Sequence, residues 1–270
     1  MKETFLYVLV LYRVPLHASP AFLSLLSARP DGQLFVYDNS PEPMGEASER
    51  VAYVHDPLNE GISKAYIVAA EYAKAHRVDR IVFFDQDTHL SVEFFDILEQ
   101  QIANHPEIAI FAPILKCGQV TVSPCRVFLY KGIENKHPLS GVHSLRGTSL
   151  INSALCVSTE AYFKSGGYNR AIRLDFSDLY FIDALRKHYK EYYLLPVELE
   201  HALSTFVDNK EKVTSRFRFY CDGARQYLNP YNFIFIATYV KLRMLKLCFR
   251  YKTVKFVKIY FRYFVCQGKL

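Results

Sequence analysis

The chain has 270 residues, of which 50% are hydrophobic and 22% are charged. This suits one large domain, alone or with an appendage, and excludes a disordered, collagen-like or small disulfide-stapled protein. Residues 223–270 hold ten Lys or Arg and no acid, whereas residues 1–222 carry 23 basic and 27 acidic residues. We therefore expect a mildly acidic body over residues 1–222 and a basic tail, rich in Tyr and Phe, over residues 223–270.

Neither the cysteines nor the first residues indicate secretion. The six Cys are far apart, without the spacing of a zinc site, so we expect buried or partly buried thiols in a reducing compartment. The apolar run at residues 5–12 meets Arg13 and Pro15 without a small-residue cleavage site, which favours a buried strand over a signal peptide. No stretch reaches the length of an uncharged membrane-spanning helix. We expect a cytoplasmic protein.

Short apolar runs alternate with helical patterns over the first 115 residues. The runs predict strands at residues 5–11, 33–37, 51–55, 81–84 and 108–112. Apolar residues recur at helical spacing from Ile62 to Ala73, and residues 92–104 predict a helix with Ser91 as its N-cap. This alternation indicates a largely parallel sheet with helices on both faces, which binds ligands at the carboxyl ends of its strands.

The pattern is less regular beyond residue 112. We expect loops and a hairpin at the sheet edge over residues 113–150. Further elements are a strand at 152–157, a helix at 159–164 ended by Gly166, a helix at 177–188, and a strand at 192–195 that ends at Pro196. The composition changes near residues 210–222, and we draw the single domain boundary there.

Polar side chains follow three of the predicted strands. Asp85 and Asp87 leave the strand at 81–84 one residue apart, so both carboxylates can face one divalent cation and the diphosphate that it bridges. A solvated acidic turn would have the same sequence. Asp38 follows the second strand, where an ordinary Asx turn is the alternative. Asn59 leads into the first predicted helix, whose N–H groups suit phosphate, although Asn59 could equally be a cap.

All three segments are expected at one edge of the sheet. Their joint occurrence is therefore stronger evidence for a diphosphate-binding site than any one of them alone. At this point the sequence resembles glycosyltransferase family 2, the inverting GT-A enzymes, and especially its rhamnosyltransferase-like branch. The matching stretches, in family order over about residues 4–230, are YDNS (37–40), NEGISKA (59–65), IVFFDQDT (81–88), INSALCV (151–157), GGY (166–168), 174–181 and 192–201. The resemblance implies a GT-A, Rossmann-like, mostly parallel sheet over residues 1–222, with a basic, aromatic helical extension over 223–270.

The resemblance also implies roles in donor binding. Asp38 and Asn59 match positions that help hold the nucleotide of the donor, and Asp85 matches the first acid of the D-x-D motif. Asp87 matches its second acid, the usual metal contact. Asn152 lies in the turn that matches the loop near the donor sugar and the acceptor.

A second metal-side residue is His201, which matches a His near the metal and diphosphate in many members of the family. A lone His is more often an ordinary surface or core residue. Because a candidate diphosphate site is present and Pro196 lies upstream of His201, we weigh a metal-binding role for His201 equally with that alternative.

The general base of the family lies in the motif that matches residues 174–179. Tyr180 stands where common members have a second acid, which leaves the assignment open between Asp175 and Asp178. If the helix begins at Ser177, Asp178 lies in its first turn, where the helix dipole favours the carboxylate form. We therefore expect Asp178 to be the base and to be ionised near neutral pH, with Asp175 shaping the turn.

The sequence thus predicts an inverting glycosyltransferase that uses a nucleotide-diphosphate sugar with Mg²⁺ or Mn²⁺. dTDP-L-rhamnose is the first donor to test, and the expected acceptor is a glycan or a lipid-linked oligosaccharide in polysaccharide assembly. A nucleotidyltransferase is the alternative enzyme, but residues 12–18 lack the glycine of a phosphate loop. A nucleic-acid-binding module is a third reading, and the acidic body argues against it, so we expect no nucleic-acid partner.

The tail predicts attachment to an anionic membrane surface. Each Lys or Arg near such a surface contributes roughly 1 kcal/mol, and the interleaved aromatic residues can enter the interface. At about 100° per residue the cations before and after residue 251 fall on different sides, so we expect two helical segments that change facing near residues 250–252. Packing of the tail on the catalytic domain or on a second subunit is the alternative. The expected location is the inner face of the cell membrane, as a peripheral protein.

Overall fold

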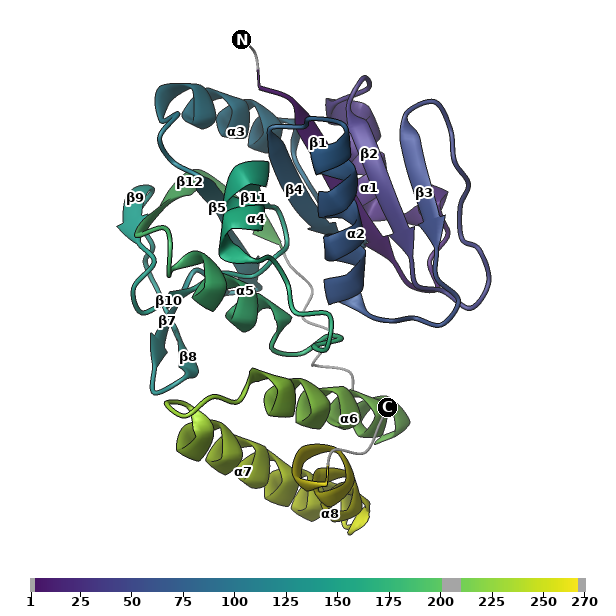
Figure 1. Ribbon diagram of the computed structural model, residues 1–270, viewed down its shortest axis with the longest axis vertical. Coiled ribbons are helices and arrows are strands. Elements are labelled where there is room, and N and C mark those ends of the chain that lie inside the picture. Colours follow the sequence, from purple (N-terminus) through teal and green to yellow (C-terminus); the bar gives the residue numbers. More distant parts are fainter. Residues whose placement is uncertain (1–2, 201–209, 267–270) are drawn as a thin grey trace.

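The computed structural model describes residues 3–200 and 210–266. Within these residues nine strands form a central sheet, of which eight follow the order β3-β2-β1-β4-β11-β5-β12-β9, while β6 pairs with β5 (Figure 1). The strands are β1 (Phe5–Leu11), β2 (Gln33–Asp38), β3 (Val51–His55), β4 (Arg80–Asp85), β5 (Ile110–Cys117), β6 (Val120–Ser123), β9 (Gly141–Ser144), β11 (Leu155–Ser158) and β12 (Glu191–Glu200). The sheet is mostly parallel, since β11, β9 and β6 alone run antiparallel to their neighbours.

Helices cover both faces of the sheet because successive residues of each strand point to opposite sides. In β1, Leu6 and Val8 belong to the core that the sheet forms with α2 (Ile62–Ala75), α4 (Thr159–Ser165) and α5 (Ser177–Leu185). Tyr7 and Leu9 face the other way, toward α1 (Pro20–Ala28) and α3 (Val92–Asn104). The predicted α/β architecture with helices on both faces is confirmed.

The strands and helices predicted for the first half are present, but the short helix α1 was not predicted, and the elements diverge more in the second half. Ser91 accepts a hydrogen bond from the N–H of Phe94 and caps α3, and Gly166 ends α4 in the left-handed conformation, both as predicted. The predicted end of a strand at Pro196 is wrong. β12 continues to Glu200, and its register against β5 shifts between Leu194 and Glu198, which accommodates a residue without an N–H.

Residues 113–150 contain more strands than expected. A second sheet, in the order β10-β7-β8, consists of β7 (Cys125–Phe128), β8 (Lys131–Glu134) and β10 (Thr148–Ser149). The hairpin between β7 and β8 turns at Leu129 and Tyr130, which both have positive φ angles, 49° and 62°. The six cysteines are unpaired, and Cys266 is exposed rather than buried as expected.

The C-terminal residues form a helical layer below the sheet in Figure 1. It comprises α6 (Lys210–Tyr227), α7 (Phe233–Tyr251), α8 (Lys255–Ile259) and a π-helical turn at Tyr260–Val265. These elements share a core that includes Phe217, Val240 and Phe256, and Ile172 of the body is buried in the same core. The layer therefore packs on the body, and the boundary drawn at residue 222 falls inside α6.

The tail divides where the charge pattern changes side. α7 ends at Tyr251, and Lys252 follows with a left-handed φ of 46° before the shorter α8 begins. This break confirms the two predicted segments. Among residues 3–200 and 210–266, no helix combines the length and the apolar character that crossing a membrane requires.

We expect α6 to tolerate no side chain at Gly223. A Cβ atom there would lie 2.2 Å from the carbonyl oxygen of Asp175, so Gly223→Ala must push the helix and that segment apart. Alanine gains about 1 kcal/mol of helix propensity, but the clash should outweigh it and lower the free energy of unfolding by about 1–3 kcal/mol. Urea unfolding tests this, with Arg218→Ala on the exposed side of α6 as the control. Equal or higher stability of Gly223→Ala would refute the close approach.

Candidate active site

A cavity of about 740 Å³ opens at the carboxyl ends of β1, β2 and β4. Its wall is formed by the ends of these strands, the start of α2, the loop before β11, residues 173–179 and the first turns of α6. Six of the eight predicted site residues line it, namely Asn59, Asp85, Asp87, Asn152, Asp175 and Asp178. Asp38 is not part of the lining, and His201 lies outside the described residues. The volume is within the usual range for small-ligand sites.

The acidic turn after β4 is held rigidly. The side chain of Gln86 accepts a hydrogen bond from the N–H of Tyr12 at 2.7 Å and donates to its carbonyl at 3.2 Å, which ties the turn to the end of β1. The N–H of Thr88 bonds to the carbonyl of Asp85 at 3.2 Å. Asp85 is half-buried and Asp87 is exposed, and both line the cavity. The backbone of the turn is therefore held in place, and both carboxylates line the cavity.

Asp178 lies in the first turn of α5, half-buried in the cavity wall. The side-chain amide of Asn152 donates a hydrogen bond to its carboxylate, and the same amide accepts one from the hydroxyl of Tyr168 at 2.6 Å. Desolvation, together with the nearby charge of Asp85, raises the pKa of Asp178 to about 7. Our expectation that the helix dipole keeps this carboxylate ionised is wrong, because desolvation outweighs the dipole.

Asp175 differs from Asp178 in its partner. Its carboxylate receives a hydrogen bond from Nε of Arg216 in α6 at 3.2 Å. Burial raises the pKa of Asp175, while the charges of Arg216 and Arg243 oppose that change. Asp175 is thus a carboxylate paired with an arginine, whereas the hydrogen bonds given to Asp178 come from the neutral groups of Asn152 and Ser177.

The start of α2 is shaped by a neighbouring loop. Gly61 has φ +102°, and a Cβ there would lie 2.3 Å from the carbonyl oxygen of Arg173. That carbonyl accepts the N–H of Ile62 at 2.8 Å, so one of the free N–H groups of the helix is already bonded within the protein. Asn59 has a left-handed φ of 48° and lines the cavity just before this contact.

Asp38 is the last residue of β2 and does not line the cavity. It is fully buried and accepts hydrogen bonds from the N–H groups of Ser40 and Met44 and from the hydroxyl of Tyr53. Burial opposes ionisation, but these donors prevail and lower the pKa of Asp38. The adjacent Asn39 lines the cavity, so the carboxylate shapes the turn that presents Asn39.

The sequence did not single out the basic side of the cavity. Lys212 and Arg216 of α6 line it together with the acids of the sheet edge. Both belong to one helix and are four residues apart, so they lie on the same face. A basic pair at helical spacing was the available signal, but the sequence alone does not bring α6 to the sheet edge.

The acidic turn suits a divalent cation that is shared with a substrate. Within residues 3–200 and 210–266, no three His, Cys, Asp or Glu side chains are grouped to enclose a metal. Mg²⁺ needs no such group where one or two carboxylates act with substrate phosphates. Asp87 and Asp85 provide that donor set at the rim of the cavity.

Comparison with known proteins identifies the fold. No family model and no curated protein matches the sequence. The structure of GalNAc-T7 with UDP, GalNAc and Mn²⁺ superposes with a TM-score of 0.57 at 12% identity, covering 85% of this chain and 52% of that one, so this chain spans about half its length. S. aureus TarS 1–349 gives a TM-score of 0.54 at 11% identity over 96% and 72%, and its UDP-GlcNAc complex gives 0.53. The GT-A fold is confirmed, and the rhamnosyltransferase-like branch is not distinguished.

We expect Asp178→Asn to stabilise the protein at neutral pH. With a pKa of about 7 in the folded state against 3.8 in the unfolded chain, Asp178 binds a proton on folding between these pH values, so it lowers stability as pH rises from 4 to 7. Asparagine stays neutral and can still accept from Asn152. The stability difference should grow over this interval, to at most roughly 4 kcal/mol, and then level off.

Urea unfolding in EDTA at pH 4.5, 6 and 7.5 measures this difference, with the exposed Asp31→Asn as the matched control. A stability difference between Asp178→Asn and wild type that does not change with pH would contradict the raised pKa of Asp178. A wild type that is the more stable protein at pH 7.5 would contradict it as well.

Proposed function

We propose that this protein is an inverting glycosyltransferase that moves a sugar from a nucleotide-diphosphate donor to a hydroxyl group of a glycan or lipid-linked oligosaccharide. The observation that carries the proposal is the meeting of the acidic turn at Asp85 and Asp87 with the half-buried Asp178 in one cavity at the edge of a GT-A sheet. The UDP, UDP-GlcNAc and Mn²⁺ complexes of the similar structures support this donor class.

Asp178 is suited to be the general base. An acid with a pKa of about 7 is half ionised at neutral pH and, once ionised, takes a proton more readily than an ordinary aspartate. Asn152 donates to one carboxylate oxygen and so orients the group. In the proposed reaction the carboxylate accepts the proton of the acceptor hydroxyl as its oxygen attacks the anomeric carbon from the face opposite the departing diphosphate, which inverts the configuration.

Other residues of the cavity wall would handle the charge of the donor. Lys212 and Arg216 are placed to attract the diphosphate, and Asp85 and Asp87 would hold a divalent cation against it. When bound, Mg²⁺ or Mn²⁺ would neutralise the charge that builds up on the leaving diphosphate. We retain Asn59 near the nucleotide and assign Asp38 an indirect part there, through the turn that presents Asn39. The metal role of His201 stays a prediction.

A screen of donors tests the proposal and its alternative. The protein is incubated with labelled UDP-GlcNAc, UDP-GalNAc, UDP-glucose and dTDP-L-rhamnose in Mn²⁺, in Mg²⁺ and in EDTA. Metal-dependent release of a nucleoside diphosphate supports glycosyl transfer, and the preferred donor decides the rhamnose prediction. Production of pyrophosphate from a nucleoside triphosphate and a sugar phosphate would support a nucleotidyltransferase instead.

We expect Asp178→Asn to lose transfer while it keeps the donor. The amide cannot accept the proton, so single-turnover transfer should fall by about 10²–10⁴-fold, with donor affinity nearly unchanged. Asp175→Asn is the matched comparison, because it alters the neighbouring acid and disturbs the contact with Arg216. A larger rate loss in Asp175→Asn would move the base to Asp175, and a loss of donor affinity alone in Asp178→Asn would refute the base assignment.

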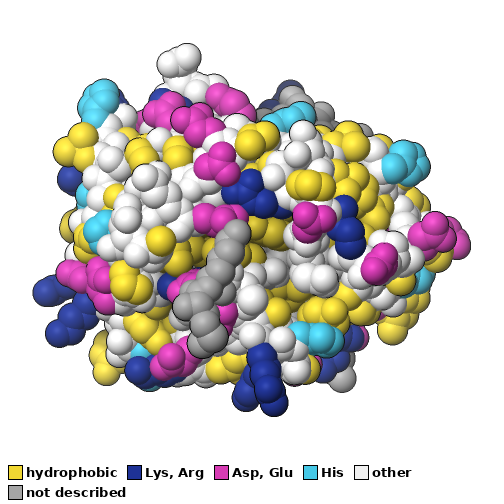
Figure 2. Space-filling model, turned by 90° about the horizontal axis from the view of Figure 1, so that it is seen from above, with side chains coloured by type: hydrophobic (Ala, Val, Ile, Leu, Met, Phe, Trp, Pro, Cys, Tyr) yellow, Lys and Arg dark blue, Asp and Glu magenta, His cyan; other side chains and the backbone are white. Residues whose placement is uncertain are grey.

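The outer face of the C-terminal layer supports the proposed attachment to anionic lipid, and hence the inner face of the cell membrane as the location. While the inner face of α7 packs in the core, Ile234 and Phe249 are 72% and 88% exposed, and Val254 beyond the helix is 69% exposed. Lys246 and Lys258 are exposed on the same layer. The opposite end of the molecule carries acidic and basic side chains interspersed (Figure 2), whereas residues 223–270 contain no acid. Packing and membrane contact are therefore compatible, since they use different faces.

We expect reversal of two charges on this face to weaken lipid binding by at least about tenfold. The variant is Lys246→Glu with Lys258→Glu, and its control is Lys187→Glu with Lys190→Glu on the body. The full chain is used because a cut at residue 222 divides α6. Sedimentation with anionic and neutral liposomes at low and high salt measures binding. Equal pelleting of the two variants, or no pelleting of the wild type with anionic lipid, would exclude the membrane role.

A further inference from the structure

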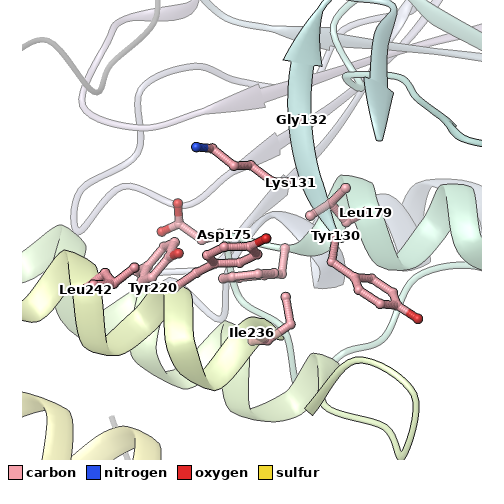
Figure 3. A pocket seen from close by; sticks show the side chains of 10 residues that line it. Tyr130, Lys131, Gly132, Asp175, Leu179, Tyr220, Ile236 and Leu242 are labelled. Carbon is pink, nitrogen blue, oxygen red and sulfur yellow. The ribbon is translucent and has the colours of Figure 1, made fainter. Parts of the chain in front are cut away.

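A second cavity, of about 490 Å³, lies between the β7–β8 hairpin, the start of α5, and the helices α6 and α7. We call it the aromatic pocket and define it by Tyr130, Lys131, Asp175, Phe176, Tyr220 and Tyr239. Figure 3 shows Tyr130 and Tyr220 at opposite ends of the pocket, with Lys131 extending over it from the hairpin. None of the roles proposed above uses this pocket.

The aromatic pocket shares a wall with the proposed donor cavity. Asp175, Phe176 and Leu179 line both spaces. These three residues surround Asp178 in the sequence, and Asp178 lines the larger cavity. A ligand in the aromatic pocket would therefore end beside the proposed base, on the side formed by the C-terminal helices.

The hairpin is held in a strained shape at this pocket. Leu129 and Tyr130 have φ angles of 49° and 62°, which in two adjacent residues normally call for Gly, Asn or Asp. The hydroxyl of Tyr239 donates to the carbonyl of Leu129 at 2.9 Å, and the ring of Tyr130 lies 6.0 Å from that of Phe235. Strain of this kind persists where surrounding contacts enforce it, and it concentrates at binding sites.

The lining combines ring surfaces with charged groups. A pyranose presents weakly positive C–H hydrogens on its flat face, which suit the negative face of an aromatic ring, and hydroxyls on its edge. Lys131 can donate to those hydroxyls and Asp175 can accept from them. A hydrocarbon chain would make no use of either charge. We propose that the aromatic pocket binds a pyranose residue of the acceptor glycan and thereby brings the reacting hydroxyl to Asp178. This inference rests on the proposed function.

Saturation-transfer NMR on the full chain tests the inference. The probes are the methyl pyranosides of glucose, galactose, mannose, N-acetylglucosamine and rhamnose at millimolar concentration, with octyl glucoside as a probe for binding through an alkyl chain. We expect at least one glycoside to receive saturation at its ring C–H protons. Tyr130→Ala and Lys131→Ala should each weaken its binding at least fivefold, whereas Phe128→Ala, on the same hairpin outside the pocket, should leave it unchanged.

Calorimetry with the nucleotide-sugar donors distinguishes a failure of the pocket assignment from a failure of the proposed function. No binding of any donor would count against the proposed function itself. Donor binding without binding of any glycoside would overturn the pocket assignment alone. Binding that Tyr130→Ala and Lys131→Ala do not alter, or octyl glucoside bound through its alkyl protons only, would do the same.

Discussion

The close packing of residues 173–178 between the helices α2 and α6 determines the position of Asp178 in the cavity. Gly61 at the start of α2 and Gly223 within α6 approach this segment so closely that a Cβ on either would lie 2.3 or 2.2 Å from a backbone oxygen of Arg173 or Asp175. The N–H of Ile62 bonds to Arg173, and Arg216 bonds to Asp175. Since α5 begins at the end of this segment, the two contacts fix where Asp178 enters the cavity. The acid is thus positioned by backbone proximity from two sides rather than by its own hydrogen bonds alone.

That position is electrostatically unfavourable for a carboxylate. The proposed role of Asp178 as a general base depends on the raised pKa that results. Desolvation of the half-buried Asp178 and the nearby charge of Asp85 raise its pKa to about 7. The rings of Tyr168 and Phe181, 4.2 Å apart, belong to the closely packed core on this side of the sheet. The body has extensive cores on both faces of its sheet, so it can sustain one destabilised carboxylate. Proton transfer at neutral pH favours a general base with a raised pKa, and the proposed role of Asp178 meets this requirement.

Much of this could be predicted from sequence, for identifiable reasons. The acidic turn was located because it follows an unambiguous buried strand, and Asn59 because it precedes a strongly periodic helix. Residues that reach the site only through contacts between distant parts of the sequence were not predicted. Lys212 and Arg216 look like an ordinary basic helix until α6 is placed against the sheet edge. The helix α1 was missed because it is short, although Ser19 caps it and Pro20 begins it. The pKa of Asp178 was misjudged because a dipole can be deduced from a helix start, whereas burial depends on segments distant in sequence.

The C-terminal layer links three features that the sequence presented as separate. α6 supplies Arg216 to the proposed donor cavity, α7 supplies Tyr239 to the aromatic pocket, and the outer face of α7 carries exposed apolar and basic side chains. The aromatic pocket therefore lies between the proposed base and the proposed lipid-facing surface. An acceptor that is anchored in a membrane could then place its sugar in the pocket without leaving the lipid. Anchoring would also confine the enzyme and its acceptor to one surface and raise their effective concentration. The helices that would contact the lipid also form walls of the aromatic pocket. The tail would therefore serve the reaction both by attaching the enzyme to the membrane and by positioning the acceptor sugar.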